Sequence, residues 1–157
     1  MAVLTAAALI IFMIEAQIPS LVPVPGVKLG LANIITLVAV YLLSRKEAGL
    51  ILLMRIILGA VFAGSPSTFL FSSFGGLLAW IVMCFLKDRI VESRIWLISV
   101  FSALAHNLGQ IIVCVLVVKT PGIFIYLPVL IASGIITGSF TGFAAMYLIR
   151  AIRKIKL

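Results

Sequence analysis

The hydrophobic positions of the chain fall into six runs, separated by short connections that are charged or rich in proline, glycine and serine. A helix that spans a bilayer needs about 20 predominantly apolar residues. The pattern therefore predicts six transmembrane helices, over residues 2–18, 29–43, 48–63, 69–86, 95–118 and 125–149. The second and third runs are short. This indicates either helices shielded by their neighbours or partners of re-entrant loops.

The composition is that of an integral membrane protein. Hydrophobic residues make up 64% of the 157 residues and charged residues only 10%. A soluble domain carries about 25% charged residues, so this chain could not cover itself with a water-exposed surface. We expect one transmembrane domain over residues 1–157, in a multi-pass protein of the cell membrane.

The basic residues predict the orientation of the chain, whose net charge is +8. Two alternate connections and the C-terminal tail hold nine of them, and the opposite connections hold only two, Lys28 and Lys119. Cytoplasmic loops of membrane proteins are enriched in Lys and Arg, so both termini are expected in the cytoplasm. The charges then face anionic lipid headgroups, and nucleic acid is not an expected partner.

Polar side chains within the apolar runs are candidate binding residues, because each is costly in a membrane. The densest group is His106, Asn107 and Gln110 in the fifth run. His106 and Gln110 are four residues apart and so share one face of a helix. We interpret the group as contacting a buried polar ligand, with hydrogen bonding between helices as the alternative.

Further polar residues converge on the outer half of the membrane: Glu15, Asn33, Ser72 and Ser73. Their convergence predicts an outward-facing pocket for a small molecule. For Glu15, the alternative is an interfacial carboxylate in contact with water.

Arg55 lies in the third run, about 9 Å from its predicted cytoplasmic end by helix rise. Its side chain either snorkels towards the cytoplasm or is buried and paired with a polar group or an anionic ligand. Lys28, in the first outer connection, is a second cation that such an anion could contact.

Small residues predict two packing surfaces. Gly134, Gly138 and Gly142 recur every four residues in the sixth run, which lets a neighbouring helix approach closely. The first run begins with the alanines Ala2, Ala6, Ala7 and Ala8. These give it a smooth face, either for packing within the bundle or for docking another membrane subunit.

The chain lacks the residues that several kinds of chemistry require. The chain has no G-x-x-x-x-G-K-[ST] phosphate loop, so it is not expected to hydrolyse ATP by itself. Its single aspartate, Asp88, cannot form the Asp-rich motifs of a prenyl diphosphate synthase. One histidine and two separate cysteines do not make a zinc site. We expect no catalytic residue, no metal and no cofactor.

Four motifs carry a family resemblance: PVPGVKLGLANI at 23–34, FSSFGGLL at 71–78, HNLGQ at 106–110 and SGIITG at 133–138. Together they resemble the membrane family called Gx transporter or heptaprenyl diphosphate synthase component I. That family is similar to the substrate-binding S components of energy-coupling factor (ECF) vitamin transporters.

The resemblance implies a six-helix S-component-like bundle with a ligand pocket that opens outward. It also implies that the first helix docks on a membrane coupling subunit driven by two cytoplasmic ATPases. We therefore expect a substrate-binding subunit of an importer. The alternatives are a membrane subunit that assists prenyl diphosphate synthesis and a stand-alone carrier or proton-coupled channel that uses Glu15 and His106.

Overall fold

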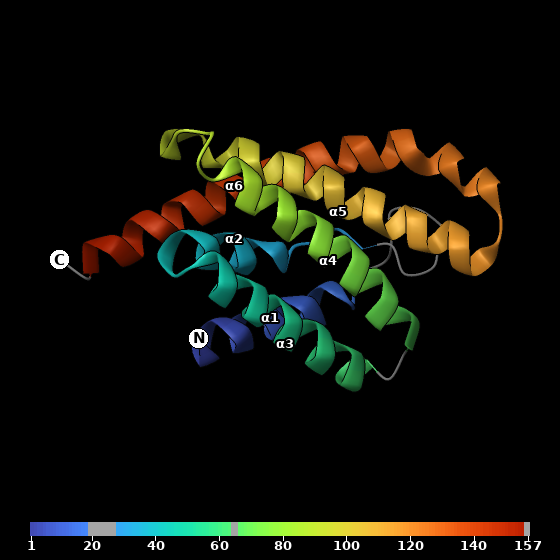
Figure 1. Ribbon diagram of the computed structural model, residues 1–157, viewed down its shortest axis with the longest axis horizontal. Coiled ribbons are helices and arrows are strands. Elements are labelled where there is room, and N and C mark those ends of the chain that lie inside the picture. Colours follow the sequence, from blue (N-terminus) through green and yellow to red (C-terminus); the bar gives the residue numbers. More distant parts are fainter. Residues whose placement is uncertain (19–27, 64–65, 156–157) are drawn as a thin grey trace.

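The computed structural model describes residues 1–18, 28–63 and 66–155, without the side chains of residues 63 and 68. These residues form a bundle of helices (Figure 1). Its α-helices are α1 (Ala2–Glu15), α2 (Asn33–Leu42), α3 (Arg45–Ala63), α4 (Pro66–Leu86), α5 (Ile95–Val118) and α6 (Leu127–Ile155). Two short 3-10 helices, η1 (Glu92–Arg94) and η2 (Pro121–Tyr126), precede α5 and α6. Residues 19–27 of the predicted outer connection at 19–28, and residues 64–65 of the one at 64–68, lie outside the described residues.

Each hydrophobic run contains one helix, but several boundaries differ from the prediction. Helix α3 begins at Arg45 rather than at residue 48, which places Arg55 about 15 Å from its start instead of 9 Å. Helix α6 continues through the predicted basic tail to Ile155, because Lys and Arg are good helix formers. Helix α2 begins only at Asn33, after Gly30 with a φ of 77°.

The outer surface of the bundle is apolar, as a membrane protein requires. Among the described residues, three helical segments are long and apolar enough to cross a membrane: Phe69–Leu86, Glu92–Val118 and Pro121–Ile155. Helices α1 and α2 are apolar but shorter. Large side chains such as Val61, 71% exposed, and Phe140, 70% exposed, point away from the bundle. A surface of this kind is stable against lipid and not against water, so the chain is a membrane protein.

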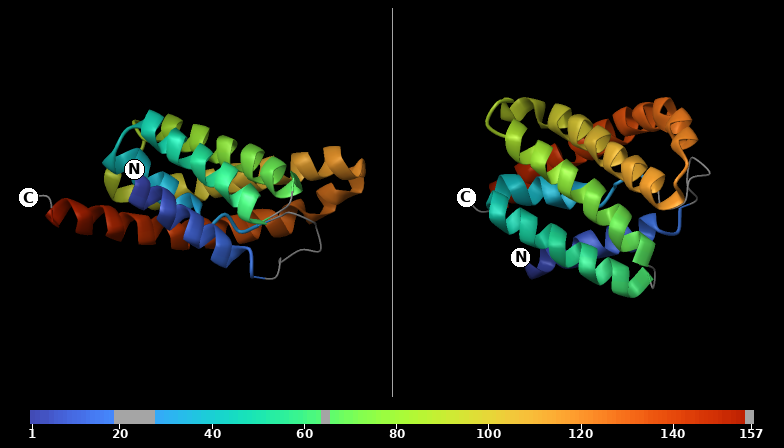
Figure 2. Two further views of the ribbon diagram at one scale, coloured as in Figure 1. Left: turned by 90° about the horizontal axis from the view of Figure 1, so that it is seen from below. Right: turned by 45° about the vertical axis from the view of Figure 1, so that its right-hand side comes forward.

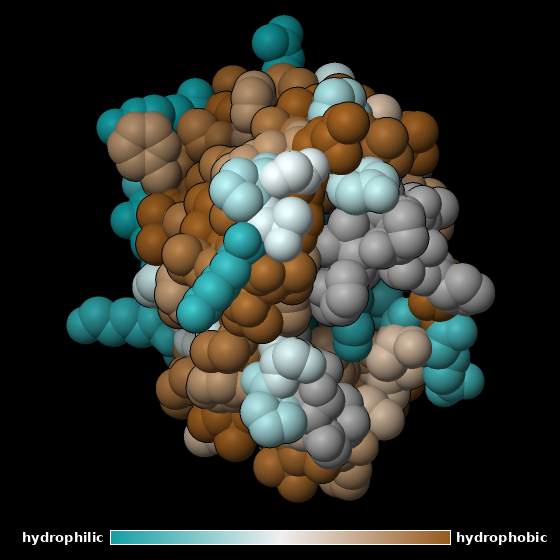
Figure 3. Space-filling model, turned by 90° about the vertical axis from the view of Figure 1, so that its right-hand side faces the viewer, coloured by the Kyte–Doolittle hydropathy of each residue, from teal (hydrophilic) through white to brown (hydrophobic). Residues whose placement is uncertain are grey.

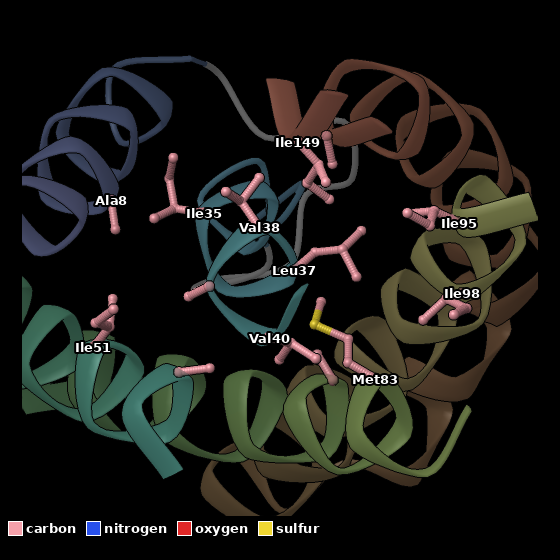
Figure 4. Close-up of a cluster of buried hydrophobic side chains, with 14 residues drawn as sticks. Ala8, Ile35, Leu37, Val38, Val40, Ile51, Met83, Ile95, Ile98 and Ile149 are labelled. Atoms are coloured by element: carbon pink, nitrogen blue, oxygen red, sulfur yellow. The ribbon is translucent and has the colours of Figure 1, made fainter. Parts of the chain in front are cut away.

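Helix α2 lies at the centre of the bundle and contacts all five other α-helices (Figure 4). Every side chain from Ile35 to Val40 is 5% exposed or less. The surrounding helices contribute the other labelled side chains in Figure 4: Ala8, Ile51, Met83, Ile95, Ile98 and Ile149. Ten residues of helix span only about 15 Å, half of a bilayer core. The sequence left two alternatives for the short second run, and the structure shows the first of them, a helix shielded by its neighbours.

Glu15, the last residue of α1, and Lys87, directly after α4, contact the two ends of α2 with their charged groups. At its start, the carboxylate of Glu15 accepts hydrogen bonds from the backbone N–H groups of Gly30 at 2.5 Å and Ala32 at 3.4 Å. At its end, Lys87 Nζ donates to the carbonyl oxygen of Val40 at 2.6 Å. A negative charge at the N-terminus and a positive charge at the C-terminus both complement the helix dipole.

Replacing Lys87 with methionine should therefore destabilise the protein. The variant keeps the apolar stem but leaves the Val40 carbonyl without its charged donor, at a cost of about 1–2 kcal/mol. We expect a melting temperature lower by roughly 4 °C in thermal unfolding of the detergent-solubilised protein. Lys46→Met is the matched control, because Lys46 is exposed at the start of α3. Equal melting temperatures for the two variants would contradict this role of Lys87.

The N-terminus and the end of α6 lie at the same end of the bundle (Figures 1 and 2). The α2–α3 and α4–α5 connections lie at that end too, and ion pairs tie the second of them to α3 and α6. Arg45 pairs with Asp88, and Arg153 of α6 pairs with Glu92 of η1. The opposite end is seen face-on in Figure 3, where hydrophobic side chains cover most of the visible surface.

Candidate functional site

A group of polar side chains is buried in the half of the bundle away from the termini. We call Glu15, Lys28, Asn33, Arg55, His106 and Gln110 the polar cluster. Except for the half-buried Lys28, each of these side chains is 7% exposed or less. They come from α1, α2, α3, α5 and the segment before α2, so the fold joins residues that are far apart in the chain.

The segment before α2 is the point at which these helices meet. The Lys28 backbone N–H donates to Gln110 Oε1 at 3.2 Å, and the Gly30 N–H donates to the Glu15 carboxylate. A methyl group at Gly30 would lie only 2.9 Å from His106 Cδ2 and 3.1 Å from Asn33 Nδ2. Position 30 therefore requires glycine for two reasons: its positive φ and the close approach of His106.

His106 is held between two glycines. On the side opposite Gly30, a methyl group at Gly75 of α4 would lie 2.8 Å from His106 Nδ1. Gly109 brings α5 against α4, because a methyl group there would be 2.9 Å from the Gly75 Cα. The imidazole is 3% exposed, and its Nδ1 faces the backbone of Gly75 without forming a hydrogen bond of ordinary geometry.

Two cations converge on one aromatic ring. Lys28 Nζ lies 4.1 Å from the centroid of the Phe12 ring, and Arg55 Cζ lies 5.6 Å from it. Both distances suit cation–π contacts. Phe12 lies three residues before Glu15, on the same face of α1. The hydrophobic pattern does not distinguish Phe12 from its neighbours, although its spacing from the only acid within a hydrophobic run is a usable signal.

The burial of Arg55 and Glu15 excludes one of the two alternatives that the sequence left open for each. Arg55 is 2% exposed, so its guanidinium does not snorkel to a surface. Glu15 is 3% exposed and is hydrogen-bonded to backbone, so it is not an interfacial carboxylate in contact with water. Glu15 lies within electrostatic range of both Arg55 and Lys28.

Several buried polar atoms at this end of the bundle have no hydrogen-bond partner among the described residues. They are Nε and Nη2 of Arg55 and Oδ1 of Asn107. Each such atom costs about 1–3 kcal/mol when it is left unsatisfied. In a native structure a group of them requires an explanation, and a ligand that supplies the missing partners is one.

Other predicted site residues lie beside the cluster or apart from it. Ser72 is buried on α4, on the face that carries Gly75 and Gly76, whereas Ser73 is half-buried. Asn107 turns towards α6, where its Nδ2 donates to the Leu130 carbonyl oxygen at 2.7 Å. Asn107 thus links helices with its amide nitrogen while its oxygen stays unpartnered.

The glycines of α6 face α5. Methyl groups at Gly134, Gly138 and Gly142 would lie 3.0 Å from Asn107 Nδ2, 2.7 Å from the Val100 Cα and 2.5 Å from the Trp96 Cα. A hydrogen bond of 2.9 Å between the Ser99 and Thr141 hydroxyls joins the two helices along the same seam. This close approach positions His106, Asn107 and Gln110 on α5.

The alanines of α1 do not share one environment. Ala2 and Ala6 are exposed, and Ala7 is half-buried. Ala8 is 1% exposed and belongs to the core around α2. An exposed face for a partner therefore includes Ala2 and Ala6 but not Ala8.

Within the described residues, no three His, Cys, Asp or Glu side chains lie close enough together to hold a metal ion. The cysteines Cys84 and Cys114 are free thiols.

Comparison with known proteins identifies the family. No curated protein and no solved structure matches the chain. The profile of the family described as heptaprenyl diphosphate synthase component I matches residues 4–148, a range that contains the whole polar cluster. The resemblance carried by the four sequence motifs is confirmed. The chain therefore belongs to the heptaprenyl diphosphate synthase component I family.

Proposed function

We propose that the chain is the substrate-binding subunit, similar to an S component, of an energy-coupling factor type importer, and that it captures a small molecule from the outer face. The polar cluster is the observation that carries the proposal. Packing alone gives no reason to bury Arg55 inside an apolar bundle with two unpartnered nitrogen atoms. A bound polar molecule would explain this burial, because it would supply the missing hydrogen bonds.

The proposal includes six membrane spans in the cell membrane, with both termini in the cytoplasm. The positive-inside rule supports this orientation, since the end that carries the termini also carries most of the Lys and Arg residues. The polar cluster then lies in the outer half of the membrane, within reach of a solute from outside.

In the proposed complex this chain performs no chemistry itself. A membrane coupling subunit and cytoplasmic ATPases supply the energy, and the exposed face of α1 around Ala2 and Ala6 is the proposed contact with the coupling subunit. Small side chains on this face would let a partner helix approach closely.

Native mass spectrometry of the gently purified protein tests the proposal. We expect a retained small molecule in the wild-type protein and its loss from Gly75→Ala, because the added methyl group displaces the His106 imidazole. Gly122→Ala is the matched control. Its methyl group would meet no atom closer than 3.9 Å, so the molecule should be retained. Retention by Gly75→Ala as well, or an empty wild-type protein, would count against the proposed capture of a small molecule at the polar cluster.

The family description favours a second candidate, a membrane subunit associated with heptaprenyl diphosphate synthesis. Such a subunit would need a partner that carries the Asp-rich sites, since this chain has a single aspartate. Prenyl transfer by the reconstituted partner, with and without this chain, distinguishes the two functions. Co-purification of a prenyl synthase, without any transporter subunit, would favour the second.

A further inference from the structure

We infer that the captured molecule carries an oxyanion group, a carboxylate or a phosphate, and that Arg55 and Lys28 bind this group beside the ring of Phe12. The inference rests on the proposed function, because it names the chemical class of the ligand at the same site.

Two nitrogen atoms of the Arg55 guanidinium have no hydrogen-bond acceptor among the described residues. Its side chain is 2% exposed, and Nε and Nη2 have no hydrogen-bond partner among the described residues. Nε and one terminal nitrogen form the edge of the guanidinium that binds carboxylate and phosphate in a bidentate manner. Gly76 of α4 lies beside this group, since a methyl group there would contact Nη2 at 3.4 Å.

Lys28 is a second cation at the same site as Arg55. Lys28 and Arg55 both contact Phe12, so two positive charges are held close together in a largely buried site. A cation–π contact contributes about 0.5–2 kcal/mol, whereas burying an ion costs several kcal/mol. The aromatic ring therefore orients the two cations but does not compensate for their burial.

The one acid at this site does not compensate for both cations. Glu15 contributes one negative charge against the two positive charges of Lys28 and Arg55, and its oxygens already accept the N–H groups of Gly30 and Ala32. The other acids, Glu47, Asp88 and Glu92, lie at the end of the bundle that carries the termini. A ligand oxyanion would balance the remaining positive charge and fill the free edge of Arg55.

Thermal unfolding of the full chain in non-ionic detergent tests the inference with simple probes. Potassium phosphate, pyrophosphate and acetate are compared with potassium chloride at equal ionic strength. We expect at least one oxyanion to raise the melting temperature of the wild-type protein saturably, by about 3 °C or more beyond chloride. Arg55→Gln should abolish this rise, and Lys28→Gln should reduce it. Arg94→Gln, at an exposed position in η1, should leave it unchanged.

A further variant keeps the test decisive if Arg55→Gln does not fold. Arg55→Lys keeps the charge but loses the planar fork, so it should show a smaller rise than the wild-type protein. Wild-type protein that responds to every oxyanion as it does to chloride would overturn the inference. So would an equal rise in the wild-type protein and in the Arg55 variants.

Native mass spectrometry separates this inference from the proposed function and identifies the source of the oxyanion. A retained phospholipid that is lost from Arg55→Gln would assign the oxyanion to a lipid headgroup, and a retained soluble acid or phosphate ester would assign it to a solute. A neutral retained molecule, or an anionic one held equally by Arg55→Gln, would overturn the inference and leave the proposed function standing. An empty wild-type protein that still responds to oxyanions would count against the proposed function alone.

Discussion

Replacing Glu15 with leucine is expected to lower the melting temperature of the detergent-solubilised protein by roughly 10 °C. The substitution removes the acceptor for the backbone N–H groups of Gly30 and Ala32, at about 1–3 kcal/mol for each buried donor left unsatisfied. It also leaves Arg55 and Lys28 without their nearest negative charge. Because helix α2 starts at this point and lies at the centre of the bundle, the loss affects the whole fold. Thermal unfolding followed by tryptophan fluorescence measures it.

Two comparisons identify the cause of that loss. Glu15→Gln retains one acceptor oxygen without the charge, so its melting temperature should fall by about half as much. Glu47→Gln removes a carboxylate at the start of α3, away from the polar cluster, and should change the melting temperature by no more than a degree or two. A Glu15→Leu protein that unfolds at the wild-type temperature would show that Glu15 does not hold the start of α2.

Replacing Gly142 with leucine should be at least as damaging, for a steric reason. The first atom of the new side chain would lie 2.5 Å from the Trp96 Cα and 2.8 Å from the Ser99 Cβ. The first of these is a backbone atom and the second is bonded directly to the backbone, so neither can move without its helix. Helices α5 and α6 must therefore separate, and the hydrogen bond between the Ser99 and Thr141 hydroxyls is lost. Overpacking alone typically costs 1–3 kcal/mol, and we expect a melting temperature lower by about 10 °C.

A graded series controls this second prediction. Ala132→Leu adds apolar volume at an exposed position of the same helix and should leave the melting temperature nearly unchanged. Gly134→Ala should be milder than Gly142→Ala, because its methyl group meets the Asn107 side chain at 3.0 Å rather than backbone. Equal stability of Gly142→Leu and Ala132→Leu would mean that α5 and α6 do not pack as closely as the structure shows.

The sequence identified most members of the polar cluster, since a charged or amide side chain in a hydrophobic run stands out against its neighbours. Glu15, Asn33, Arg55, His106 and Gln110 were all found in this way. Phe12, Gly30 and Gly109 were not, because an aromatic ring or a glycine is ordinary within an apolar helix or in the segment that leads into one. Their importance depends on which atoms lie opposite them, and that is settled only when α1, α4 and α5 are packed together.

The sequence by itself determined that the chain is a membrane protein, where its helices lie to within a few residues, and which side chains are costly to bury. Long apolar runs bounded by charged or proline-containing connections suffice for this. Only the tertiary structure decided that α2 is the central helix, that Ala8 faces inward, and that Arg55 meets Lys28 at Phe12. The physical reason is that lipid is as apolar as the core of the bundle. Hydrophobic periodicity therefore does not fix how a helix is rotated, and packing between helices determines it.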